Sequence, residues 1–247
     1  MHVMAACLGL LIATHMVSAP AHAASLTAVG GYDHYAGAAG QRTDGAVGAL
    51  VLGVAGGDLM VAGVRYDDST IGPGTSLTAG VGVPVLGGAK LRVAGTRFLG
   101  DDSFRAWRAK IGPQLSLPGG RTLTLSYQRY QDNQSSHSNG TIAEATTPVM
   151  ERLGAKASAS YATVMEGPAA VQGSVGLSWS PIAHLELSGE VGAARNASAV
   201  AGQPIPGRQP LGGLSILGGG SSGGTGPSTI QEQVVRTVLV GVRVTLP

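Results

Sequence analysis

Apolar and polar residues alternate along several segments of this chain. The clearest segment runs from Leu123 to Tyr130 and reads Leu-Thr-Leu-Ser-Tyr-Gln-Arg-Tyr, directly after the turn-forming residues Pro118-Gly119-Gly120. A period of two places one set of side chains on one face of a β-strand and the other set on the opposite face. The same alternation returns at Val171 to Trp179, at Leu185 to Val191 and at Val238 to Leu246. The pattern predicts an all-β chain.

Glycine-rich and polar turns divide most of the chain into strands of similar length. The predicted strands are Ser25–Tyr35, Gly45–Val54, Leu59–Tyr66, Thr75–Val85, Lys90–Phe98, Phe104–Leu117, Leu123–Tyr130, Leu153–Tyr161, Val171–Trp179, Leu185–Val191 and Gln233–Leu246. One further short strand is predicted near Leu211 to Leu217, and Gln131 to Thr147 is predicted as a long polar loop. Bacterial single-chain barrels use even strand numbers. The sequence therefore predicts an antiparallel transmembrane β-barrel of about 12 strands, with 10 as the alternative count.

Composition favours strands that face lipid. The chain has 247 residues, of which 43% are hydrophobic, 12% are charged and 40 are Gly. An ordinary soluble domain is about a quarter charged, whereas a barrel whose outer face meets lipid needs little charge there. Many Gly residues disfavour long helices, because Gly costs about 1 kcal/mol per helical position relative to Ala. The net charge of +2, without any run of Lys or Arg, gives no reason to expect a nucleic-acid partner.

The first 23 residues resemble a secretory signal peptide. Leu8 to Ile12 forms an apolar centre, and Ala21-His22-Ala23 is a small-x-small cleavage site. We therefore expect a signal peptide at 1–23 and a barrel domain at 24–247. The chain after residue 23 contains no Cys, so neither disulfides nor thiolate chemistry are expected. It also contains no uninterrupted apolar run of about 18 residues, so any membrane crossing must use strands.

Sorting the strands by face places a set of charged residues inside the barrel. The set comprises Arg92, Arg108, Lys110, Arg152, Lys156, Arg243, Glu186, Glu190 and Asp33. One interpretation is a mildly cationic lumen that favours anionic solutes, because lumen side chains tune selectivity. The other is internal ion pairing that fills the barrel, for instance Arg243 with Asp33 across the closing seam. Barrels of eight strands are filled by side chains and barrels of sixteen leave a channel, so ten to twelve strands leave both interpretations open.

Aromatic residues gather at one end of the predicted strands. With the N-terminus on the periplasmic side, the outer end holds Tyr32, Tyr35, Tyr66, Phe98, Phe104, Tyr127, Tyr130 and Trp179. Tyr161 is the exception and falls at the other end. Because amphipathic rings prefer the membrane interface, this distribution predicts an aromatic girdle.

Little in the sequence indicates catalysis or a bound group. Asp33-His34 at the outer rim could supply an acid and a general base, but the alternation points the two side chains to opposite faces. Asp67-Asp68 and Asp101-Asp102 could bind divalent cations, although such pairs more often form polar turns. We therefore predict no catalytic residues, no metal site and no cofactor.

Over residues 24–247 the strands, the girdle and the long polar loop resemble those of the bacterial outer-membrane β-barrel superfamily. The chain departs from that superfamily at its end, where Val244-Thr245-Leu246-Pro247 replaces the usual terminal aromatic residue. The resemblance implies export through a cleaved signal peptide to the bacterial outer membrane. It also implies contact with outer-membrane lipid, help from the barrel-assembly machinery during insertion, and a monomer.

Three functions fit this sequence. The first is a small passive pore, or a surface or structural scaffold, with a mildly cationic lumen. The alternative is an outer-membrane barrel enzyme acting on envelope lipid or peptide, which requires polar residues of the outer rim to converge in space. The third is a secreted, soluble β-rich domain like those of adhesins, which requires the outward Leu and Val faces to pack against a second sheet.

Overall fold

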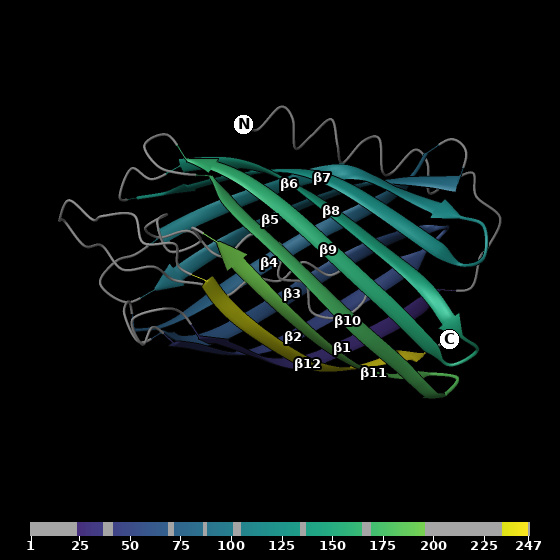
Figure 1. The fold of residues 1–247 in the computed structure, drawn as a ribbon. Helices are drawn as coiled ribbons and strands as arrows, with labels where there is room; N and C mark the ends of the chain where they lie inside the picture. The colour runs from purple at the N-terminus through teal and green to yellow at the C-terminus, as the bar shows by residue number, and fades with distance from the viewer. Residues whose placement is uncertain are drawn as a thin grey trace.

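A computed structural model describes residues 24–36, 42–68, 72–85, 88–100, 105–133, 137–164, 169–195 and 234–246. This part of the chain forms twelve strands (Figure 1): β1 (Ser25–Ala36), β2 (Arg42–Val54), β3 (Gly57–Asp68), β4 (Gly72–Pro84), β5 (Ala89–Gly100), β6 (Arg105–Leu117), β7 (Arg121–Asp132), β8 (His137–Met150), β9 (Leu153–Val164), β10 (Ala170–Ile182), β11 (Leu185–Arg195) and β12 (Val234–Leu246). No helix in these ranges is long and apolar enough to span a membrane. The predicted signal peptide at 1–23 lies outside them.

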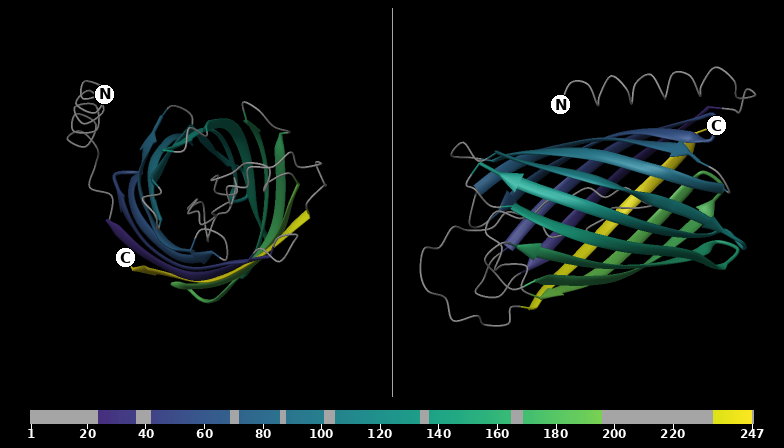
Figure 2. Two further views of the ribbon diagram at one scale, coloured as in Figure 1. Left: turned by 90° about the vertical axis from the view of Figure 1, so that its left-hand side faces the viewer. Right: turned by 90° about the horizontal axis from the view of Figure 1, so that it is seen from above.

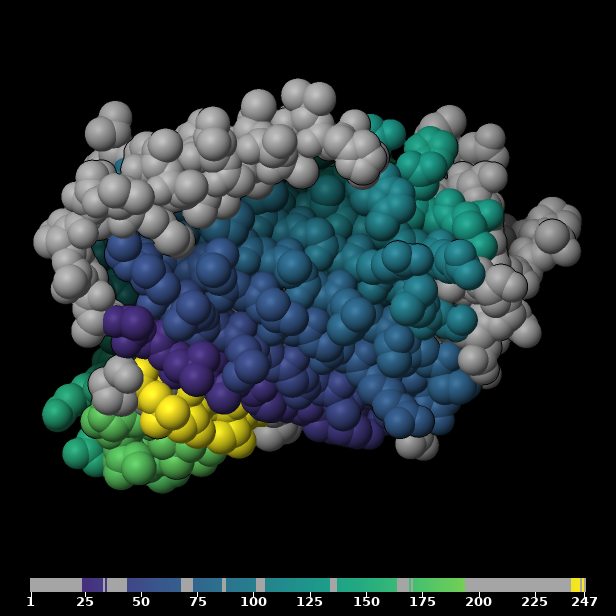
Figure 3. All heavy atoms as spheres, turned by 180° about the vertical axis from the view of Figure 1, so that it is seen from behind, coloured from purple at the N-terminus to yellow at the C-terminus, as the bar shows by residue number. Residues whose placement is uncertain are grey.

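The strands close into a barrel in which each pairs antiparallel with its sequence neighbours and β12 pairs with β1. The closing seam runs from Leu26 opposite Leu246 to Ala36 opposite Arg236. Figure 2 shows the ring of strands along its axis, and in Figure 3 the purple β1 lies against the yellow β12. Closure leaves no strand edge with unpaired backbone groups, which is what a sheet needs in lipid. The prediction of an antiparallel β-barrel of 12 strands is therefore confirmed.

The barrel has two different ends. Tight turns at 55–56, 118–120, 151–152 and 183–184 lie at one end, together with Ser25 and Leu246, and we call this the turn end. The opposite end, where the longer connections leave and return, is the loop end. Ala55 and Gly56 both have positive φ, 50° and 77°, as a two-residue hairpin turn requires.

Side chains alternate between the two faces of the wall. On β7 the polar Ser126 and Gln128 are buried inside, whereas Leu125 and Tyr127 are 46% and 48% exposed on the outside. Most of the other strands also expose large apolar side chains outward, for instance Leu77 on β4, Ile111 on β6 and Leu177 on β10. An apolar outer face around a largely polar interior is typical of barrels that stand in lipid. The soluble alternative required these outer faces to pack against a second sheet, and the structure shows them exposed.

One strand was missed in the sequence. The segment predicted as a loop from Gln131 to Thr147 contains most of β8, whereas the predicted strand near Leu211 to Leu217 lies outside the described residues. The predicted number of strands, twelve, is confirmed, but the twelfth strand is β8 and not the segment near Leu211. The alternation fails on β8 because its inner face includes the apolar Ile142 and its outer face includes the polar Asn139.

The inner wall of β1 to β3 differs from the rest of the interior. Val29, Ala49, Met60, Ala62 and Val64 form a buried apolar cluster there. This agrees with the sequence of β2, which is apolar on both faces. The described charged side chains inside the barrel therefore lie mainly on other strands, β5 to β12, with Asp58 at the turn end of β3 as the addition.

Candidate functional site

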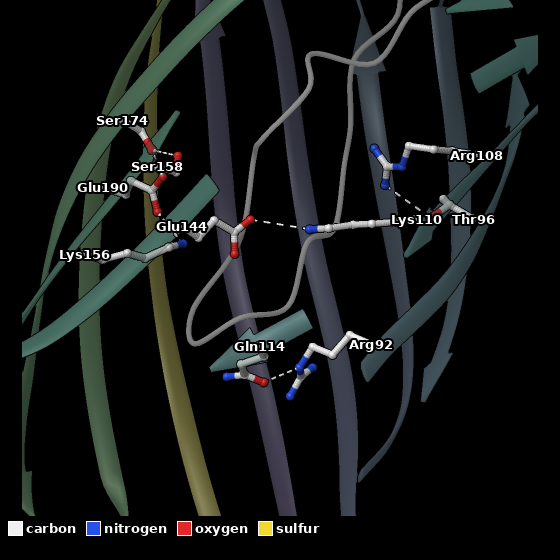
Figure 4. Close-up of polar contacts among 10 residues, drawn as sticks. All are labelled: Arg92, Thr96, Arg108, Lys110, Gln114, Glu144, Lys156, Ser158, Ser174 and Glu190. Carbon is white, nitrogen blue, oxygen red and sulfur yellow. Dashed lines mark hydrogen bonds and ion pairs between the residues drawn. The ribbon is translucent and has the colours of Figure 1, made fainter. Parts of the chain in front are cut away.

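Four cations line the inner wall formed by β5 and β6, which we call the β5–β6 wall. They are Lys90, Arg92, Arg108 and Lys110. Lys90 Nζ and Arg92 Nη2 both approach Asp58 Oδ2 on β3, at 3.3 and 3.0 Å. Two cations thus share one carboxylate at the turn end. Arg92 Nε also donates a hydrogen bond of 2.5 Å to Gln114 Oε1, which holds the guanidinium against the wall (Figure 4).

Arg108 lies further towards the loop end and is 4% exposed. Its Nη2 donates to Thr96 Oγ1 at 3.2 Å, and its guanidinium carbon lies 5.6 Å from the centre of the Phe98 ring. Phe98 in turn meets Tyr130 edge to face, with ring centres 6.3 Å apart. Within the described residues Arg108 has no acidic partner, so a hydroxyl and the ring face stabilise its charge.

Lys110 has a carboxylate of its own. Its Nζ lies 3.4 Å from Glu144 Oε1, which reaches over β7 from β8 (Figure 4). Both side chains are largely buried, at 13% and 5% exposure. Asp58 and Glu144 therefore pair with three of the four cations of the β5–β6 wall in the described part of the chain, and a further buried carboxylate, Asp132, lies at the loop end of β7.

On the opposite wall, formed by β9, β11 and β12, each cation has its own carboxylate. Lys156 Nζ lies 3.0 Å from Glu190 Oε2, and Arg243 Nη1 lies 3.4 Å from Glu186 Oε2. Ser174 on the intervening β10 donates a short hydrogen bond to Glu190 and shares another with Ser158 (Figure 4). We call this the paired wall. β5 and β11 stand six places apart in the ring of twelve, so the two walls face each other.

A cavity of about 410 Å³ opens at the turn end, lined mainly by residues of β7 to β12. Its charged lining residues include Glu144, Lys156, Glu186, Glu190 and Arg243. Thr122 and Thr146, joined by a hydrogen bond of 2.6 Å, add hydroxyls to the lining. Charged and hydroxyl groups of this kind hold water and small polar solutes.

Arg152 lies exposed in the turn between β8 and β9 and donates to the carbonyl oxygen of Pro181, so it lines the cavity from a turn and not from a strand. Arg243 pairs with Glu186 on β11. The register does not favour the suggested pairing with Asp33, because Arg243 stands opposite Val29 while Asp33 stands opposite Leu239, four residues further along β1. The side chain of Asp33 lies outside the described residues.

The structure also adds residues that the sequence analysis left out. Asp58 and Lys90 stand at strand ends, where alternation is hard to assign, and Glu144 belongs to the unrecognised β8. Asp132, buried beside Tyr130 at the loop end, fell in the same predicted loop. Recognition of β8 would have found Glu144, whereas Asp132 required the extension of β7 beyond Tyr130.

The predicted aromatic girdle needs correction. Tyr66, Phe98 and Tyr130 are 2–3% exposed and point inward, so they do not belong to an outer girdle. Trp179 points outward but lies at the turn end, opposite Leu187 and Leu153. Tyr32 and Tyr127 lie exposed on the outer face towards the loop end.

Tyr161, the predicted exception, also lies on the outer face towards the loop end. The prediction placed it at the opposite end because, without β8, the predicted direction of β9 is reversed. The side chain of Tyr35 and all of Phe104 lie outside the described residues.

Polar residues of the outer rim converge at one place. His34 Nδ1 and Tyr32 Oη contact the same oxygen of Asp44, at 2.7 and 2.5 Å, on the outer face. The acidic partner of His34 is thus Asp44 and not its sequence neighbour Asp33. Within the described ranges no group of three or more His, Cys, Asp or Glu is arranged to hold a metal ion.

No family model and no curated protein matches this chain. Several solved structures match its fold. The NanC porin is 10% identical with a TM-score of 0.60, covering 90% of this chain and all of that one. The KdgM porin in complex with disordered oligogalacturonate is 12% identical with a TM-score of 0.59, covering 89% and 99%. The translocator domain of the autotransporter NalP from Neisseria meningitidis is 11% identical with a TM-score of 0.51, covering 98% and 95%. At these identities the likeness shows the fold.

Proposed function

We propose that this chain, which has the fold of the bacterial outer-membrane β-barrels, resides in that membrane as a monomer and acts as a small passive pore with a preference for anionic solutes. Insertion by the barrel-assembly machinery belongs to the same proposal. The observation that carries the preference is the charge balance of the β5–β6 wall, where Asp58 and Glu144 face four cations. The described side chains of the paired wall opposite balance, with the cations Lys156 and Arg243 against the carboxylates Glu190 and Glu186.

The two walls would act together on a permeating ion. A solute that passes between them meets an excess of positive charge on one side and balanced pairs on the other. Low-dielectric walls focus the field of such an excess into the aqueous space and raise the local concentration of anions. The partly exposed guanidinium group of Arg92 offers a forked donor that matches carboxylates, whereas the buried Arg108 contributes its charge alone. Hydroxyls such as Thr122 and Thr146 can replace hydration water.

An acidic oligosaccharide is a suitable larger test solute. The KdgM porin, which shares the fold, is described in complex with oligogalacturonate. The β5–β6 wall supports the same chemistry here, because its cations are spread along two adjacent strands from Lys90 at the turn end to Arg108. A chain of carboxylates could contact them one after another.

The test is single-channel recording of the refolded protein in a planar bilayer, once a heat-dependent shift in gel mobility shows that the barrel has folded. We expect discrete conductance steps and, under a KCl gradient, a reversal potential that indicates anion preference. A folded, inserted barrel that gives no conductance contradicts the pore.

Neutralising the β5–β6 wall should reduce the preference. In Arg92→Gln/Arg108→Gln we expect the anion-to-cation permeability ratio to fall by about twofold per charge, since a charge about 8 Å away in water contributes about 0.5 kcal/mol. The matched control is Lys156→Gln/Glu190→Gln, which removes one charge of each sign from the paired wall and should leave the ratio unchanged. Equal effects in both variants contradict the role assigned to the β5–β6 wall.

A further inference from the structure

Three arginines stand on the outer face of β5, β6 and β7 near the loop end. Arg97, Arg105 and Arg129 are exposed, and none has an ion pair within the described residues. Arg97 pairs with Trp107 across the ladder, and Arg105 pairs with Leu99, so the three guanidinium groups project from neighbouring strands. The described outward positions of β5 to β9 carry no Asp or Glu. Unpaired cations on a lipid-facing wall are costly unless an anionic group meets them.

A groove begins one row from Arg129, towards the middle of the wall. It has a volume of about 760 Å³ and runs over the outer face of β6 to β10. Its sides include Leu125, Tyr127, Tyr161 and Val171, each 46–49% exposed. Tyr127 and Tyr161 stand two strands apart, which places them about 10 Å from each other. Small side chains between them leave the groove open.

The register orders this surface into three rows across β7, β8 and β9. The row nearest the loop end holds Arg129, Asn139 and Thr163. The next holds Tyr127, Thr141 and Tyr161, and the third holds Leu125, Ala143 and Ala159. Successive rows on one face are about 7 Å apart. A charged row, an aromatic row and a small apolar row therefore follow one another from the loop end towards the middle of the wall.

Hydrogen bonds fix the upper part of the groove. Tyr127 Oη donates to Asn139 Oδ1 at 2.7 Å, which leaves the amide nitrogen of Asn139 as a donor beside Arg129. Thr163 Oγ1 donates to the carbonyl oxygen of Asn139 at 3.2 Å. These bonds link β7, β8 and β9 at the level where the charged row meets the aromatic row.

We infer that this surface binds a phosphorylated lipid of the leaflet at the loop end. Its phosphate contacts Arg129, with Arg97 and Arg105 as further donors, and an acyl chain lies in the groove between Tyr127 and Tyr161. Arginine is suited to this ligand because its planar fork donates two parallel hydrogen bonds to a phosphate. The inference rests on the proposed membrane location and is independent of pore activity.

The test is native mass spectrometry of the folded barrel released from neutral detergent, with bisphosphorylated lipid A and its phosphate-free form as probes. The wild type should retain the phosphorylated lipid and lose the phosphate-free form. Equal retention of both overturns the inference without any variant. Inorganic phosphate at the same concentration should not displace the lipid, and full displacement would show that the site takes free anions.

Variants separate the two parts of the site. Arg97→Gln/Arg105→Gln/Arg129→Gln should weaken retention about tenfold or more, whereas Arg121→Gln at the turn end of the same outer face should have no effect. Ala159→Phe fills the groove floor and should also weaken retention, whereas Ala157→Phe, two residues along β9 and outside the groove, should not. Unchanged retention in the triple variant overturns the inference. Failure of the heat-dependent gel shift or of vesicle insertion in the wild type would instead contradict the membrane location.

Discussion

The β5–β6 wall and the paired wall face each other across one lumen, yet they stabilise their cations differently. On the paired wall Lys156 and Arg243 each have a carboxylate of their own. On the β5–β6 wall Lys90 and Arg92 share Asp58, and Arg108 relies on Thr96 and the ring of Phe98. An ion pair such as Lys156–Glu190 links two strands of the wall, and because its charges cancel it adds little to the electric field in the lumen. A cation without its own carboxylate leaves charge for a solute, so we assign structure to one wall and selectivity to the other.

The largest effect is expected from a change that moves a charge to the outer face. Leu177 and Ser178 are neighbours near the middle of β10, with Leu177 58% exposed outward and Ser178 facing the turn-end cavity. Leu177→Arg should destabilise the folded barrel by about 2–4 kcal/mol, the cost of Arg near the bilayer midplane. Ser178→Arg should cost far less, because the lumen side is polar. Urea unfolding in lipid vesicles measures both, and equal losses would contradict the assignment of the faces.

A smaller loss of stability should follow when one paired cation loses its carboxylate. Glu190→Gln removes the carboxylate that lies 3.0 Å from the largely buried Nζ of Lys156, and we expect a loss of about 1–3 kcal/mol in the free energy of unfolding. The double variant Lys156→Gln/Glu190→Gln removes both charges and should be closer to the wild type. A double-mutant cycle by urea unfolding measures the coupling. A double variant that loses the sum of the two single losses would show that the pair does not act as a unit.

The smallest effect concerns Glu144, the carboxylate of Lys110. Glu144→Gln gives the β5–β6 wall one more unbalanced cation, so anion preference should rise by about twofold, as for a charge about 8 Å from the permeating ion. The control Asp67→Asn removes the same charge from the exposed outer face of β3 and should not change the reversal potential. The increase should shrink at high salt, where charges are screened. A fall in anion preference would show that Glu144 does not act through Lys110.

The faces of the barrel wall could be predicted for strands in which apolar and polar residues alternate clearly. Leu123 to Tyr130 assigns its own faces, because Leu and Tyr alternate with Thr, Ser and Gln, and β7 has that arrangement. β8 lacks the contrast, since Ile142 points inward and Asn139 outward. Without β8 the predicted direction of β9 to β11 is reversed, which places Trp179 and Tyr161 at the wrong ends. Inward aromatics such as Phe98 and Tyr130 follow the alternation but not the expectation that rings gather at the membrane interface.

The sequence by itself determined that the chain forms an all-β barrel with an apolar outer face, because a period of two is a local property of each strand. Tertiary structure alone decided which charges meet. Arg243 pairs with Glu186 and Lys110 with Glu144 because the stagger between strands sets which inner side chains come within reach. The groove beside Arg129 has the same origin, since its residues come from five strands and become neighbours only through the register. Alternation assigns a side chain to a face, whereas closure and stagger assign its neighbours.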